Sequence, residues 1–78
     1  MKLPLLSARK LVKALEKHGF QYAPKRGKGS HVALVRKTKE GDTFLVIIPM
    51  KDPIPRGTLL SIIKQSGFLR EEFLRILK

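Results

Sequence analysis

The chain has 78 residues, of which 17 are lysine or arginine and 6 are aspartate or glutamate, for a formal net charge of +11 at pH 7. This length allows one domain, residues 1–78, with a small core to which every helix and strand contributes. The absence of cysteine excludes a disulfide framework and thiolate-bound zinc. No apolar run approaches the roughly 20 residues of a membrane span, so we expect a cytoplasmic protein with no membrane partner.

The positive charge is concentrated in the first half of the chain. Residues 1–39 contain 11 basic residues and one acidic residue, Glu16, so +10 of the net charge of +11 lies there. Such asymmetry favours a polyanionic partner, with nucleic acid as the first candidate, although a solvated basic surface has the same composition. With one tyrosine and four phenylalanines, we do not expect an aromatic platform for stacking bases.

The first predicted element is a helix that begins after Ser7, whose hydroxyl is suited to cap it. Its apolar face is formed, at helical spacing, by Ala8, Leu11, Val12 and Leu15. Its solvent face carries Arg9, Lys10, Lys13 and Lys17. His18 and Gly19 close the helix, because glycine favours the left-handed conformation after a helix end and a histidine in the last turn complements the dipole. We therefore interpret His18 as structural.

Three strands are predicted next, over residues 20–23, 31–37 and 43–48. The third is rich in β-branched and aromatic residues and is expected to be buried, and a turn at 39–42 joins it to the second as a hairpin. In the second strand Val32 and Leu34 share one face, and His31 lies on the other. If the first pair faces the helices, His31 projects from the open face of the sheet, but the pattern also allows the reverse.

The second half of the chain predicts two more helices. Three prolines between residues 49 and 55 make a stiff linker, after which a helix begins and ends at Gly67. A short amphipathic tail helix follows, with apolar residues at Leu69, Phe73, Ile76 and Leu77. The predicted fold is α+β, with a three-stranded antiparallel sheet covered by helices on one face.

A basic loop broken by glycine, residues 25–30, leads directly into His31. Its glycines allow the backbone to approach a ligand closely, its cations hold phosphate, and His31 is the nearby group that exchanges a proton near neutral pH. Ser30 is excluded as a catalytic partner because successive strand residues point to opposite faces, and the spacing excludes a P-loop. The candidate RNA-binding residues are Lys25, Arg26, Lys28, Gly29 and Ser30, with Lys51 and Arg56 added by charge.

Short matches to a known family run through nearly the whole chain. They are the first helix with His18-Gly19-Phe20, then Arg26, Gly29-Ser30-His31, Ile48-Pro49, Gly57-Thr58-Leu59, Ile62 and Lys64-Gln65-Ser66-Gly67. Through these residues the chain resembles HicA-type toxins, the mRNA interferases of type II toxin–antitoxin pairs. Met50-Lys51 stands where members of that family often have a second histidine.

The resemblance implies a fold like that of the double-stranded-RNA-binding domain, α-β-β-β-α with a short tail helix. It also implies ribosome-independent cleavage of mRNA, a HicB-type antitoxin that blocks the site, and a catalytic histidine at His31. Because the chain has neither an acidic cluster for magnesium nor a histidine–cysteine ligand set, we expect cleavage without a metal or cofactor. Neutral His31 takes the proton of the attacking 2′-OH, while the cations of the loop stabilise the phosphate oxygens.

Two other interpretations fit the same residues. A non-catalytic RNA-binding module of the same fold would bind RNA with steep salt dependence but tolerate His31→Ala. A subunit that acts within a complex would present its charge to an acidic antitoxin, so that the pairing weakens as salt rises.

Overall fold

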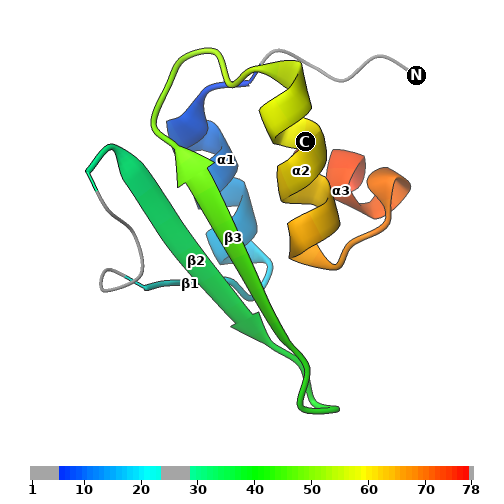
Figure 1. Cartoon of the computed structure of the whole chain (residues 1–78). Coiled ribbons are helices and arrows are strands. Elements are labelled where there is room, and N and C mark those ends of the chain that lie inside the picture. The colour runs from blue at the N-terminus through cyan, green and yellow to red at the C-terminus, as the bar shows by residue number, and fades with distance from the viewer. Residues whose placement is uncertain (1–5, 24–28, 78) are drawn as a thin grey trace.

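The computed structural model describes residues 6–23 and 29–77. In these parts of the chain six elements follow one another (Figure 1). They are α1 (Ala8–Lys17), β1 (Gln21–Tyr22), β2 (His31–Lys37), β3 (Thr43–Pro49), α2 (Arg56–Ser66) and α3 (Arg70–Ile76). This order confirms the predicted α+β class and is consistent with the arrangement of a double-stranded-RNA-binding domain followed by a tail helix.

The strands form an antiparallel sheet in the order β1-β2-β3. β2 and β3 pair along their whole length, from His31 opposite Pro49 to Lys37 opposite Thr43. The turn between them contains Gly41 at φ 93°, a backbone conformation that glycine adopts without strain. The predicted hairpin is therefore confirmed. β1 pairs with β2 at two positions and is shorter than the predicted strand over 20–23.

The prediction that the third strand is buried is correct for one face only. β3 lies at the edge of the sheet, and its exposure alternates: Val46 and Ile48 are buried, whereas Leu45 and Ile47 are half-buried. One face of β3 packs on the helices and the other faces away from them. Branched and aromatic residues suit any pleated strand, so the composition of this segment did not reveal the alternation.

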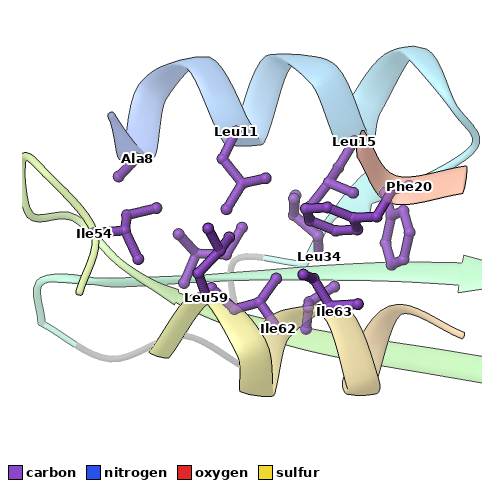
Figure 2. Packing of buried hydrophobic residues seen from close by; sticks show 12 residues of the cluster. Ala8, Leu11, Leu15, Phe20, Leu34, Ile54, Leu59, Ile62 and Ile63 are labelled. Carbon is purple, nitrogen blue, oxygen red and sulfur yellow. The ribbon is translucent and has the colours of Figure 1, made fainter. Parts of the chain in front are cut away.

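The core lies between the sheet and the helices. In the view of Figure 2, α1 lies above the cluster of buried side chains and α2 lies below it. α1 contributes Ala8, Leu11 and Leu15, and α2 contributes Leu59, Ile62 and Ile63. The other members of the buried cluster are Phe20, Leu34, Val46, Ile48, Ile54 and Phe73. Because Phe73 belongs to α3 and is fully buried, the tail helix covers part of the core.

The start of α1 is tied to the linker between β3 and α2. Ser7 caps the helix as predicted, its Oγ accepting from the amide of Lys10 at 3.2 Å. A carboxylate oxygen of Asp52 accepts from the amide of Ala8 at 2.9 Å, and the amide of Ile54 donates to the carbonyl of Leu6, also at 2.9 Å. These bonds satisfy amides of the first turn and hold the linker against α1.

At the C-terminal end of α2, the side chain of Arg36 lies among aromatic rings and bonds to the last turn of the helix. Arg36 points to the helix side of the sheet, where its guanidinium lies 4.5 Å from the ring centre of Phe68 and 4.7 Å from that of Phe44. One of its terminal nitrogens donates to the carbonyl of Ser66 at 3.0 Å, at the end of α2. Gly67 then adopts φ 80°, as predicted for a residue that ends a helix.

Candidate functional site

A cleft of about 410 Å³ lies where the β2–β3 hairpin, the linker and α2 meet. The sheet contributes His31, Ile47 and Pro49 to its lining, the linker contributes Lys51 and Pro55, and α2 contributes Thr58, Ser61, Ile62 and Gln65. Figure 1 shows α2 running beside the end of β3, the two elements that supply most of this lining. Imidazole, ammonium, hydroxyl and amide groups therefore share one open hollow.

His31 reaches this cleft because of the alternation of strand residues. Leu34 of the same strand is fully buried against the helices, so His31, three residues earlier, belongs to the opposite face. The side chain is exposed and begins β2 opposite Pro49. Of the two parities that the sequence allowed, the structure has the one that places His31 on the open face.

The rest of the basic loop falls in two classes. Lys25, Arg26 and Lys28 lie outside the described residues. Gly29 and Ser30 are exposed, with Gly29 at φ 61°, and the carbonyl of Ser30 accepts from the amide of Met50 at 2.8 Å. The last residues before His31 are thus fixed to the start of the linker.

The two distant cations predicted for the site lie in different places. Lys51 lines the cleft together with His31. Arg56 is the first residue of α2 and is exposed, but it is outside the set of residues that line the cleft. His18, interpreted as structural, is the exposed C-cap of α1, and its amide donates to the carbonyl of Leu15 at 3.0 Å.

Gln65 is a cleft residue to which the sequence gave no role. Its side-chain oxygen accepts from the amide of Ile47 at 3.2 Å, which satisfies an outward-facing donor of the edge strand β3. Pro49, the next residue of β3 with the same orientation, has no N–H to satisfy. Because the oxygen of Gln65 is engaged, its NH₂ group carries the two donors that remain for a ligand in the cleft.

Thr58, Ser61 and Gln65 form a polar stripe on α2 that sequence reasoning missed. Their spacing of three and four residues puts them on one face of the helix, away from the buried Leu59 and Ile63. This spacing was the available signal. The spacing of residues within α2 does not predict that the helix lies along the edge of β3. Because it does, the polar stripe lines one side of the cleft.

Two further features concern ligands and membranes. Among the residues that the structure describes, no three histidine, aspartate or glutamate side chains come together as a candidate metal site. In the same part of the chain, no helix has the length and apolar character needed to cross a membrane.

The fold and the site define a small α+β protein with a histidine-bearing cleft at the edge of a three-stranded sheet. The family model described as the HicA toxin of bacterial toxin–antitoxin matches residues 8–68. This match covers most of the chain, which therefore belongs to the HicA toxin family, as the sequence resemblance indicated. It is the toxin component of a toxin–antitoxin system and has an antitoxin partner. A search of curated proteins found no match.

Proposed function

We propose that this toxin is an endoribonuclease that cleaves mRNA in the cytoplasm, independently of the ribosome, with His31 as the general base. The observation that supports this most directly is the position of His31, exposed on the open sheet face in a cleft that also holds Lys51. Membership of the HicA family supports the same assignment. A catalytic histidine needs both access to substrate and a cation near the reacting phosphate, and this cleft combines the two.

The reaction uses a nucleophile that RNA itself carries. Neutral His31 takes the proton of a 2′-OH as that oxygen attacks the adjacent phosphorus. The bond from phosphorus to the 5′ oxygen breaks, and the leaving 5′ oxygen takes a proton from water. The products carry 2′,3′-cyclic phosphate and 5′-OH ends. Charge grows on the non-bridging oxygens in the transition state, where the ammonium of Lys51 and the NH₂ group of Gln65 stabilise it. No metal enters this route.

Substrate binding extends from the cleft into the loop before β2. Lys25, Arg26 and Lys28 contact phosphates by charge, and the backbone at Gly29 and Ser30 allows close approach of the RNA. Arg56, at the start of α2, adds a longer-range attraction. These roles follow from charge and from proximity to His31 in the sequence or the fold.

The antitoxin in this proposal is of the HicB type and covers the cleft. Because the chain carries a net charge of +11, the covering surface is expected to be acidic, and the affinity of the pair is expected to fall as salt rises. A salt-independent complex would point instead to an apolar contact.

The test compares two histidine variants, because the chain contains two histidines. End-labelled single-stranded RNA is incubated in EDTA with the wild type, with His31→Ala and with the matched control His18→Ala. We expect the wild type and His18→Ala to produce cyclic phosphate ends, whereas His31→Ala is slower by about 10²- to 10⁴-fold, the usual contribution of a general base. Circular dichroism checks that all three chains are folded.

Two outcomes would contradict the proposal. Cleavage that requires a divalent metal and leaves 5′-phosphate ends would exclude the 2′-OH mechanism. If wild type and His31→Ala both bind RNA and neither cleaves it, the protein is a non-catalytic RNA-binding module.

A further inference from the structure

A second cleft, of about 590 Å³, lies between the start of α1 and the linker. Its lining includes Arg9, Lys10 and Lys13 of α1 together with Met50 and Asp52 of the linker. None of these residues belongs to the catalytic arrangement proposed above. We call this hollow the α1 cleft.

Three cations on one helix face give the α1 cleft its charge. Arg9 and Lys13 are four residues apart and Lys10 and Lys13 are three apart, so the three side chains are neighbours on the helix surface. All three are exposed, and the first turn of α1 contains no acidic residue. Like charges at this spacing disfavour the helix, and cations near a helix N-terminus oppose its dipole. Stability of the helix therefore does not account for this arrangement.

The acid in the lining does not cancel this charge. Asp52 contributes one negative charge against the three positive charges of the lining, and one of its carboxylate oxygens accepts from the amide of Ala8 at 2.9 Å. Ser7 Oγ accepts from the amide of Lys10. Because these backbone donors are satisfied within the protein, an anion in the cleft would be bound by the side chains of Arg9, Lys10 and Lys13.

The two clefts are joined by consecutive residues of the chain. Pro49 and Lys51 line the His31 cleft, and Met50 and Asp52 line the α1 cleft, so adjacent residues face different hollows. The amide of Met50 donates to the carbonyl of Ser30 next to His31, and Asp52 is bonded to α1. The linker thereby holds both clefts in a fixed relation. Figure 1 shows the end of β3 and the start of α1 at the same end of the molecule.

We propose that the α1 cleft is a second phosphate-binding site for the RNA strand whose reacting phosphate lies at His31. This inference rests on the proposed function, since it assigns the same substrate to both clefts. A polynucleotide carries regularly spaced phosphates, so a strand that leaves the His31 cleft across Met50 meets the three cations of α1. The exposed Met50, with 42% of its surface accessible, provides apolar contact for a sugar or base at the crossing.

The test replaces the three cations by glutamine, in a chain with Arg9→Gln, Lys10→Gln and Lys13→Gln. The matched control removes the same charges elsewhere with Lys39→Gln, Lys64→Gln and Arg70→Gln, three exposed residues at the hairpin tip and near the junction of α2 and α3. The binding probe is single-stranded RNA with 2′-O-methyl groups, which lacks the nucleophile and stays intact. Affinity is measured over a range of salt concentrations, and thermal melting checks the fold.

We expect the α1 variant to bind this probe about ten- to a hundredfold more weakly than the control at 0.1 M salt. The slope of log affinity against log salt should be smaller by about two, the change expected when three phosphate contacts on a single strand are lost. Its melting temperature should be no lower than that of the wild type. With cleavable RNA, KM rises for a long strand, while a dinucleotide, which occupies only the His31 cleft, is cleaved equally by both variants.

Other results separate this inference from the nuclease assignment. Equal affinity and equal salt slope for the two triple variants would overturn it. Equal RNA binding with a loss of antitoxin affinity in the α1 variant would assign the cleft to the protein partner and also overturn it. If the wild type binds the probe through α1 but does not cleave unmodified RNA, the second site stands and the nuclease function fails.

Discussion

The two faces of β2 carry different chemistry. The helix-facing side holds Leu34, which is completely buried, and Arg36, whose charge is enclosed by aromatic rings and bonded to the end of α2. The outer side begins with His31, which is exposed at the cleft. With the role proposed for His31, one strand serves both stability and function, on alternate residues.

This difference separates what a substitution should change. A residue on the inner face is held by packing, so its loss lowers the free energy of unfolding. A residue on the outer face at the cleft has few internal contacts to lose, so its replacement should change activity and leave the fold intact. Substitutions on the two faces of β2, and at the end of α2 that the inner face contacts, test that separation.

The largest effect is expected on the outer face. His31→Ala should lower the cleavage rate by about 10²- to 10⁴-fold, because it removes the proposed general base, while the melting temperature stays within a few degrees of the wild type. Cleavage kinetics and thermal melting are measured on the same preparation. A large fall in melting temperature would mean that the histidine also stabilises the sheet, and the separation of the two faces would fail at its most important position.

Leu34, three residues further along the same strand, should show the opposite behaviour, with a large change in stability. Leu34→Ala removes a side chain with no exposed surface and should cost about 2–5 kcal/mol of folding free energy, through lost burial and a residual cavity. Since small domains have about 5–15 kcal/mol in total, the variant is expected to melt far earlier. Val35→Ala on the outer face, where Val35 is half-buried, is the control in urea unfolding. Equal losses for the two variants would contradict the assignment of faces.

The next prediction concerns Gly67, which ends α2 and lies against the aromatic rings around Arg36. Gly67 has φ 80°, and a Cβ there would lie 2.5 Å from the ring of Phe44, one of the rings around Arg36. Gly67→Ala should cost about 1–2 kcal/mol for the left-handed backbone alone, with the clash against Phe44 adding to this. Gly57→Ala is the control, because that position within α2 has open space and no positive φ, and should be neutral or stabilising.

The features that the sequence predicted are those governed by local rules. Ser7, Gly19 and Gly67 marked helix ends because capping and left-handed backbone depend on residue type, and the span of β2 followed from its composition and the turns beside it. The face on which His31 lies depended on one choice of parity. Leu34 decides it by packing in the core with the helices, since Ala33 on the face of His31 is equally buried but lies outside that cluster.

What the sequence did not predict depends on contacts between distant parts of the chain. The carboxylate of Asp52 bonds to an amide 44 residues earlier, and Arg36 bonds to a carbonyl 30 residues later. The position of α2 against β3, which makes Gln65 a wall of the site, is of the same kind. No local pattern encodes such pairs, because each partner taken alone resembles an ordinary surface residue.

The smallest change in structure gives the sharpest test of Gln65. Gln65→Glu keeps an oxygen that accepts from the amide of Ile47, so folding stability should change by less than about 0.5 kcal/mol. It replaces the two donors that face the cleft by a negative charge, which repels phosphate, so RNA affinity should fall by about tenfold at low salt and recover partly as salt rises.

Gln65→Leu supplies the complementary case. It leaves the amide of Ile47 without its acceptor and should lower stability by about 1 kcal/mol, while adding no charge to the cleft. If Gln65→Glu binds RNA as well as the wild type does, Gln65 is only an edge contact for β3, and the proposed polar contacts to the substrate are reduced to His31, Lys51 and the hydroxyls of α2. If the two variants separate as expected, one amide side chain holds the sheet edge with its oxygen and the substrate with its nitrogen.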